Sequence, residues 1–404
     1  MLRAGRVALT AAMAVGLLVL GSVRGSAAEV PTACAFLSNM MDAQPSGAVF
    51  LPSFPTVKSG PLTGAAFLYD NAVATIALIG CGEAKKAVQI GDAMLVALDH
   101  DRHWRDGRLR NGYLAGPVGA GPVKLTGWWD AKLKLWAEDR YQVGSDSGNM
   151  AWAILALLAL DGATGDHHYR DGATRIGAWI KQWRSKIDPG GYTGGVFAHE
   201  TAPVVETWKS TEHNTDLFAA FSGLARMRGE KAWRVEADAA LRFVHAMWRP
   251  ACGCFAVGTG RDGKTLNLYL ALDAQTWPLL AIPKAAQRYK AAIAPAALRV
   301  QQGFAYSEAR TGVWTEGTAQ VALLLELSGR NDEARQLLKA LDAVRAPSGS
   351  YYASSTRELP TGFMLETDPT KRRQYFRVEH LAAVAWVAIA QRRFNPFTGT
   401  NALP

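Results

Sequence analysis

The sequence predicts an all-α fold in which six two-helix units close into a ring. Three observations predict it. The same helical hairpin returns along the chain, its two helices differ in character, and only a short break separates them. The first helix of each pair is apolar almost all round behind a polar start, whereas the second carries charges on one face. A helix that is apolar on every side is buried, and a helix with one charged face borders water. The pattern therefore predicts an inner layer of buried helices inside an outer, solvent-facing layer.

Each hairpin opens with a polar group that leads into an apolar helix. In the second unit, residues 148–152 open a helix that runs through Leu160, and the break at 164–166 leads to a polar-faced helix ending near Trp183. Breaks this short make two helices antiparallel neighbours. The predicted inner helices begin near Asp70, Gly148, Glu212, Asp273, Glu316 and Val378. The predicted outer helices end near Leu98 and Trp183 in the first two units and span Trp233–Trp248, Lys284–Ala294 and Asp332–Val344 in the next three.

The sixth inner helix has no partner after it in the sequence. Thr32–Ala43, which precedes the first unit, can complete the outer layer. The segments between units are long and rich in glycine and aromatic residues, as at Gly191-Tyr192 and Tyr351-Tyr352. Such segments are typical of short β-hairpins or loops, which we expect on one rim of the ring. Long loops in a compact domain are usually functional.

The first 28 residues have the features of a targeting segment. Arg3 and Arg6 precede an apolar stretch from Val7 to Leu20, and Ser26-Ala27-Ala28 forms a small-residue cleavage site. This order is typical of a secretory signal peptide. We expect cleavage near Ala28, one domain over residues 29–404, and a periplasmic or secreted protein that is not held in a membrane. An uncleaved anchor is the alternative, although the apolar run is shorter than the about 20 residues that span a bilayer.

Composition and charge narrow the function classes. The 404 residues are 49% hydrophobic and 20% charged, which excludes disordered, collagen-like and coiled-coil chains. The net charge is +9, and without the three arginines of residues 1–28 the 44 basic residues become 41, against 35 acidic ones. This mild excess is compatible with an acidic polymer as partner. Because no arginine-rich run occurs, we expect no nucleic-acid binding.

All four cysteines, Cys34, Cys81, Cys252 and Cys254, follow the signal segment. An oxidising compartment permits disulfides, and four cysteines allow three connectivities. Cys34 with Cys81 would tie the N-terminal segment to the first hairpin. Cys252 and Cys254 lack the two-residue spacer of zinc and redox motifs, so we interpret them as structural.

On its hairpin pattern the chain resembles the six-hairpin glycosidase superfamily, whose fold is the (α/α)6 barrel. The resemblance covers roughly residues 30–395. It rests on the polar groups that open the inner helices: Tyr69-Asp70-Asn71, Gly148-Asn149-Met150, Ser210-Thr211-Glu212, Asp273-Ala274-Gln275, Trp314-Thr315-Glu316 and Val378-Glu379-His380. It implies an (α/α)6 barrel, or six-hairpin toroid, and a poly- or oligosaccharide substrate. The superfamily also contains polysaccharide lyases and epimerases, so the fold does not fix the reaction.

Carboxylates and tryptophans gather at the rim where the inner helices begin, because in such a ring these helices all run the same way. Sugar hydrolysis uses one carboxyl group to protonate the glycosidic oxygen and another to activate water or attack the anomeric carbon. Indole rings offer flat apolar faces to sugar rings. The candidate catalytic residues are Glu212, Asp70, Asp273 and Glu316. The candidate substrate-binding residues are Asp216, His213, Asn149, Asp146, Tyr69, Trp208, Trp277, Trp314 and Tyr192.

Acids at helix N-termini can also serve only as caps, which accept hydrogen bonds from free N–H groups. This role is the alternative for Asp70 and Asp146. It explains Glu212 less well, since Ser210 or Thr211 can cap that helix.

A helix N-terminus lowers the pKa of a carboxyl group, whereas a general acid needs a raised pKa. Trp208 and Asp216, on either side of Glu212, can supply the apolar wall and the like charge that raise it. Glu212 is therefore the best candidate for the general acid. We expect an inverting mechanism, frequent in the superfamily, with Asp70, Asp273 or Glu316 as base. In inverting enzymes about 6.5–9.5 Å separates the two carboxyl groups, against about 5–5.5 Å in retaining ones.

Other motifs do not fit their structural context. The glycine spacing of residues 258–263 matches that of a dinucleotide-binding loop. A helix follows such a loop, whereas an extended pattern follows residue 263, so we interpret the segment as a glycine-rich turn. The pairs His100/His103 and His167/His168 lie in breaks or loops, where surface histidines are commoner than metal ligands. We expect no metal and no cofactor.

Three functions remain open. The favoured one is an exported, monomeric glycoside hydrolase that cleaves a polysaccharide with two carboxylates. The second is a lyase or epimerase acting on a uronic-acid glycan, which would use residues such as His199, His213, Tyr192 and Arg140. The third is a non-catalytic glycan-binding protein of an exopolysaccharide pathway, which needs the tryptophans but not the acids.

Overall fold

The structure, a computed structural model, describes residues 32–365 and 368–404; the predicted signal segment lies outside them. Helices make up two layers. The inner helices are α2 (Leu68–Gly80), α4 (Ser147–Thr164), α6 (Thr211–Arg228), α8 (Asp273–Ala281), α10 (Thr315–Leu327) and α12 (Leu381–Arg392). The outer helices are α1 (Ala33–Asp42), α3 (Ala84–Asp99), α5 (His168–Ile180), α7 (Lys231–Ala246), α9 (Ala285–Arg288) and α11 (Asn331–Ala340). Short 3₁₀ turns, η1 (Lys181–Trp183), η2 (Lys290–Ala292), η3 (Ala296–Leu298) and η4 (Leu341–Val344), follow or link them.

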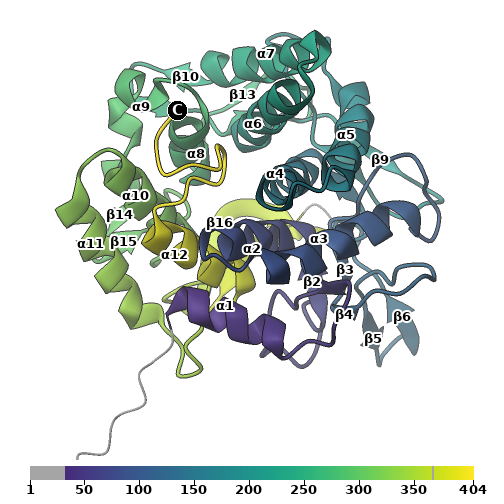
Figure 1. The fold of residues 1–404 in the computed structure, drawn as a ribbon. Coiled ribbons are helices and arrows are strands. Elements are labelled where there is room, and N and C mark those ends of the chain that lie inside the picture. Colours follow the sequence, from purple (N-terminus) through teal and green to yellow (C-terminus); the bar gives the residue numbers. More distant parts are fainter. Residues whose placement is uncertain (1–31, 366–367) are drawn as a thin grey trace, which may run out of the picture. The chain divides into compact units, whose positions relative to one another are not determined.

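The inner helices pack against one another in chain order, and α12 packs back against α2 (Figure 1). Buried residues occupy nearly every position of α2, α8, α10 and α12, as their apolar sequences predict. Helix α1 packs against α12 and α2, so the segment before the first unit supplies the missing outer helix. Its N-cap is Thr32, whose hydroxyl accepts a hydrogen bond from the Ala35 N–H at 3.2 Å. The predicted all-α class and two-layer arrangement are confirmed.

The fourth outer helix is shorter than the sequence predicts. Of the expected span 284–294, only Ala285–Arg288 forms an α-helix. Tyr289 ends it with φ −116° and ψ 43°. The tyrosine ring packs against Trp248 and Phe255, with ring centroids 4.5 and 4.9 Å away. Aromatic packing here overrides the helical propensity of the alanine-rich sequence.

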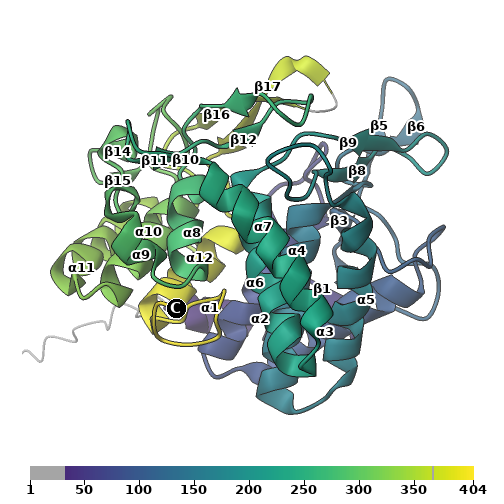
Figure 2. The same cartoon turned by 90° about the horizontal axis from the view of Figure 1, so that it is seen from above.

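Short antiparallel ribbons fill the segments between the units. Figure 2 shows that they gather on one side of the helices. The strands are β1 (Val49–Phe50), β2 (Ala65–Phe67), β3 (Gly112–Leu114), β4 (Gly116–Pro117), β5 (Trp128–Asp130), β6 (Leu135–Ala137), β7 (Ser145–Asp146), β8 (Gly195–Phe197), β9 (Val204–Glu206), β10 (Trp248–Arg249), β11 (Cys254–Phe255), β12 (Gly258–Thr259), β13 (Leu266–Asn267), β14 (Arg299–Val300) and β15 (Gly303–Phe304), followed by β16 (Glu358–Leu365) and β17 (Asp368–Phe376). The predicted rim of β-hairpins is confirmed, whereas the longest hairpin, β16–β17, was not predicted. Residues 258–263 open the β12–β13 hairpin and form the predicted glycine-rich turn.

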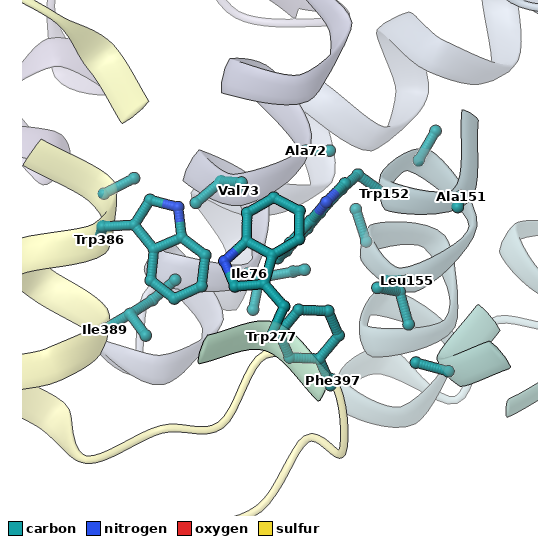
Figure 3. Close-up of a cluster of buried hydrophobic side chains, with 14 of the residues drawn as sticks. Ala72, Val73, Ile76, Ala151, Trp152, Leu155, Trp277, Trp386, Ile389 and Phe397 are labelled. Atoms are coloured by element: carbon teal, nitrogen blue, oxygen red, sulfur yellow. The ribbon is translucent and has the colours of Figure 1, made fainter. Parts of the chain in front are cut away.

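The centre of the helical layers is filled by an aromatic cluster (Figure 3). Trp152 of α4 lies 5.2 Å from Trp277 of α8 and 5.8 Å from Trp386 of α12, between ring centroids. Phe397 of the C-terminal tail packs on Trp152 at 5.1 Å. These rings fill much of the space between the inner helices. Trp277, only 2% exposed, belongs to this core.

Both cysteine pairs form disulfides. Cys34 of α1 bonds to Cys81, the residue after α2, and Cys252 bonds to Cys254. The first bond ties the N-terminal helix to the first hairpin as predicted. Among the described residues, no helix has the length and apolarity that a bilayer crossing requires.

Candidate active site

The starts of the inner helices meet at one end of the molecule, here named the N-terminal rim. Asp70 and Glu316 lie in the first turns of α2 and α10, and both contact His380, the N-cap of α12. Glu212 lies in the first turn of α6 and hydrogen-bonds to Asp273, the first residue of α8. The structure therefore brings the four candidate catalytic carboxyl groups to the same rim, in two groups.

The first group is the carboxyl pair Glu212 and Asp273. Burial and then the charge of Asp273 raise the pKa of Glu212 well above its usual range. Burial also raises the pKa of Asp273, to about 6, while the Ala274 N–H, which donates to its Oδ1 at 2.7 Å, opposes the rise. The hydrogen bond between them favours the proton on Glu212 and the charge on Asp273. Glu212 is thus a protonated donor near neutral pH.

Capping does not explain Glu212. Ser210 is the N-cap of α6, because its hydroxyl accepts from the His213 N–H at 3.3 Å, as the sequence predicts. Asp146, in contrast, is the N-cap of α4, and its carboxylate accepts from the N–H groups of Gly148 and Asn149 at 2.8 and 3.2 Å. Asp146 therefore caps its helix, as the alternative to a role in binding predicted, whereas Glu212 does not cap α6.

Asp216 does not act as expected. It is completely buried, and neither carboxyl oxygen accepts a hydrogen bond of standard geometry, although the Trp152 indole N–H is directed at it. Burial and then the charges of Glu212 and Asp273 raise its pKa well above its usual range, so it is neutral. The like charge that raises the pKa of Glu212 therefore comes chiefly from Asp273 and not, as predicted, from Asp216. A neutral acid cannot repel its neighbour.

The second group is a chain of buried polar contacts. His380 Nε2 lies 3.1 Å from Asp70 Oδ2, and its Nδ1 lies 3.3 Å from Glu316 Oε1. Burial lowers the pKa of His380, but the two carboxylates outweigh it and raise that pKa to about 10. The Tyr69 hydroxyl donates to Glu316 Oε2 at 3.1 Å and accepts from the Trp386 indole N–H at 2.7 Å. A charged imidazolium therefore holds Asp70 and Glu316 in place.

Tyrosines link the two groups. The ring centroids of Tyr306 and Tyr375 lie 5.6 Å apart, and the charges of Asp273 and Glu316 act on the pKa values of both hydroxyls. Burial raises the pKa of both hydroxyls well above their usual range. They are therefore neutral hydrogen-bonding groups that lie within electrostatic range of both acid groups.

Arg373 of β17 adds a positive charge near these groups. Its guanidinium carbon lies 5.8 Å from the centroid of the Tyr141 ring, and its positive charge lowers the pKa values of Glu212 and Asp273. Asn149 Nδ2 donates to the Tyr141 hydroxyl at 3.1 Å and so positions it. Arg373, Tyr141, Tyr306 and Tyr375 were not among the predicted site residues. The alternate spacing of Arg373 and Tyr375 along a strand is the signal that could have found these two, whereas no comparable pattern marks Tyr141 and Tyr306.

The other predicted binding residues take mixed positions. Trp208 is partly exposed, donates its indole N–H to Glu206 Oε2 at 2.9 Å and packs beside His213. Burial lowers the pKa of His213, which favours a neutral ring.

Trp314 is 2% exposed and packs under Tyr306. Tyr192 is fully buried and donates its hydroxyl to Glu236 at 2.5 Å. Tyr192 and Trp277 are therefore buried in the core in this structure, and their predicted role in substrate binding stays a prediction.

A cavity lies away from the candidate residues of the rim. A cavity of about 820 Å³ is lined by Glu326, Arg330 and Arg393 together with the C-terminal tail. Glu326 stands at the opposite end of α10 from Glu316, so this cavity is remote from the rim. Within residues 32–365 and 368–404, no three His, Cys, Asp or Glu side chains are placed to hold a metal ion.

Comparison with solved structures places the chain among glycosidase folds. A glycosidase carrying a glutamate-to-alanine substitution is 15% identical with a TM-score of 0.60, covering 89% of this chain and 94% of its own. An α-amylase from Clostridium perfringens is 9% identical with a TM-score of 0.60, covering 92% of this chain and 99% of its own. A family 76 α-mannanase from Bacteroides thetaiotaomicron is 11% identical with a TM-score of 0.55, covering 89% and 94%. No protein-family profile and no curated protein sequence matches the chain. The fold is thus one that glycosidases share.

Proposed function

We propose that this protein is an exported glycoside hydrolase of the (α/α)6-barrel type that cleaves a poly- or oligosaccharide, with Glu212 as general acid. The single observation that carries the proposal is the hydrogen-bonded pair of Glu212 and Asp273 at the N-terminal rim. A carboxyl group that stays protonated at neutral pH can donate its proton to a glycosidic oxygen. The glycosidase folds of similar shape support the same reaction class. Two disulfides support export to an oxidising compartment.

The general base of this proposal is Glu316. Asp273 is in direct hydrogen-bond contact with Glu212, which is closer than the about 6.5–9.5 Å that seats a water in an inverting enzyme. Asp70 Oδ2 is engaged in a hydrogen bond with His380 Nε2 at 3.1 Å. Glu316 Oε1 lies 3.3 Å from His380 Nδ1 without a hydrogen bond of standard geometry, so of the carboxylates beside His380 it is the one less tightly held. Glu316 and Glu212 then form the inverting pair, Asp273 keeps the proton on Glu212, and Asp70 positions the imidazolium.

A lyase or epimerase is less well supported. Such an enzyme removes a proton next to a carboxylate and needs a base, often a tyrosine of lowered pKa. Tyr306 and Tyr375 have raised pKa values, and Tyr192 lies in the core. Arg140 is exposed and His199 is partly exposed. Only His213, with its lowered pKa, stands at the rim as a neutral base.

The test is a panel of polysaccharides incubated with the purified mature protein, with reducing ends and ultraviolet absorbance measured in parallel. New reducing ends without absorbance indicate hydrolysis, and proton NMR of the first anomer formed separates inversion from retention. Absorbance from an unsaturated uronate would contradict the proposal in favour of a lyase. Binding without new reducing ends would favour the non-catalytic alternative.

A further inference from the structure

We propose that the substrate carries a carboxylate, as in a uronic-acid glycan, and that Arg373 binds this group at the N-terminal rim. The inference rests on the proposed function and names the substrate class of the same site. It starts from a cation that lies beside the acidic pair and that no carboxylate of residues 32–365 and 368–404 pairs with.

The β16–β17 hairpin fixes the position of Arg373. The register of the hairpin shifts between the pairs Pro360–Gln374 and Met364–Arg372. The Arg373 guanidinium carbon nevertheless lies 5.8 Å from the Tyr141 ring centroid, and its charge lowers the pKa of Tyr375, so both side chains are on the same face of the hairpin. Tyr375 packs on Tyr306 and Trp314, with centroids 5.6 and 5.5 Å away, so this face is turned toward the site. The Thr361 hydroxyl donates to the Arg373 carbonyl at 2.8 Å and fixes the backbone.

Arg373 has no ion-pair partner in the described part of the chain, where no carboxylate oxygen lies within 4.0 Å of its guanidinium. The neighbouring Lys371, in contrast, pairs with Asp368 at 3.0 Å. Glu212 and Asp273 influence Arg373 only through longer-range attraction. Arg373 also remains exposed to solvent beside Tyr141, so its donors are free for a ligand.

The chemistry of this arrangement selects an anionic sugar. A guanidinium offers a planar, bidentate donor pair that matches a carboxylate. Glu212 is protonated, so a second carboxylate bound nearby meets one negative charge in the pair rather than two. A neutral sugar could use the same donors, but it would leave the positive charge uncompensated. The mild positive charge of the whole chain agrees with an acidic polymer.

A second role for Arg373 must be separated from this one. The positive charge of Arg373 lowers the pKa of Asp273 and so favours its ionised form. This electrostatic effect alone would make Arg373 important for the turnover of any glycan. A tuning role changes kcat equally for neutral and acidic substrates. Carboxylate binding instead changes affinity, and only for substrates that carry the carboxylate.

Affinity electrophoresis tests the inference independently of hydrolysis. The Glu212→Gln variant is run through gels that contain polygalacturonate, hyaluronan or glucuronoxylan, or the carboxyl-reduced form of each polymer. We expect at least one acidic polymer to retard the protein and its reduced form not to do so. Arg373→Gln in the same background should weaken this retardation by about 10- to 100-fold in apparent Kd, the scale of a charge-assisted bidentate contact.

The matched control is Arg372→Gln, since Arg372 is the adjacent exposed arginine on the opposite face of β17. It should bind like its parent. The inference is overturned if no acidic polymer retards the protein, if the reduced polymers bind equally, or if both arginine variants weaken binding alike. Absence of hydrolysis by the wild type, together with retained Arg373-dependent binding, would reject the proposed function and leave the inference standing.

Discussion

At the scale of single residues, the chemistry proposed for the candidate site depends on which carboxyl and imidazole groups carry a proton. Glu212 and Asp273 share one proton, and His380 carries another between Asp70 and Glu316. The sequence could predict Glu212, because Ser210 visibly takes over the capping role. It could not predict that Asp273 rather than Asp216 supplies the like charge, since that depends on how α6 and α8 approach each other. It also could not show that Asp216 is completely buried with the Trp152 indole N–H directed at it.

Replacing Asp273 by Asn should shift the pH dependence of catalysis. Asp273 raises the pKa of Glu212, so loss of its charge lets Glu212 ionise at lower pH. The alkaline limb of the kcat/KM profile should therefore move down by on the order of one pH unit. The measurement is a pH–rate profile of both proteins, with Asp332→Asn, an exposed substitution on α11, as control. An unmoved alkaline limb would show that Asp273 does not tune the acid.

Replacing Asp70 by Asn should flatten the dependence of stability on pH. The pKa of His380 is about 10 in the folded protein, against about 6.5 when unfolded. A raised pKa contributes stability that is complete below about pH 6.5 and is lost as the pH rises through about 10. Asp70→Asn removes one partner and lowers the pKa of His380, so less stability remains to be lost. Urea unfolding from pH 6.5 to 9.5 measures this, and parallel curves for both proteins would count against a charged His380.

At the scale of elements, helices and hairpins differed in how well the sequence predicted them. Apolar runs that follow a polar group predicted all the inner helices, because a helix that is buried on every side has apolar residues at nearly every position. The β16–β17 hairpin escaped prediction because Pro360, Gly362 and Pro369 interrupt the strand alternation. Yet this hairpin brings Arg373 and Tyr375 to the rim, so the missed element carries part of the site.

Gly362→Ala tests whether the position of this hairpin matters for substrate binding. Gly362 has φ +88°, and an added Cβ would lie 1.9 Å from the Tyr269 hydroxyl oxygen. The substitution should cost about 1–2 kcal/mol for the left-handed backbone alone, and the steric clash should displace the hairpin and raise KM severalfold. Gly329→Ala is the control, because it has a similar φ of +80° with no atom within 4 Å of the new Cβ. If both variants have the parent KM, the position of the hairpin is not needed for binding.

At the scale of the whole molecule, α1 completes the outer layer and a disulfide holds it there. The Cys34–Cys81 bond closes a loop with a sequence separation of 47, whereas Cys252–Cys254 closes one with a separation of 2. Loop-closure entropy predicts that replacing the first pair by serine costs about 4 kcal/mol, and the second less than half of that. Chemical denaturation of the two double variants measures the difference. Equal losses would mean that the first bond does not anchor α1.

The central claim is that Glu212 donates the proton that releases the leaving group of a glycoside. It is tested most directly by assaying Glu212→Gln on two substrates, a natural glycan and an aryl glycoside whose leaving group departs without a proton. We expect a loss of at least ~10²-fold on the glycan and a much smaller loss on the aryl glycoside, with an unchanged circular dichroism spectrum. Glu333→Gln, an exposed substitution on α11, should leave both rates unchanged. A folded Glu212→Gln variant with near-normal turnover of the glycan would remove Glu212 from the mechanism and leave Glu316 and Asp273 as the candidates for the acid.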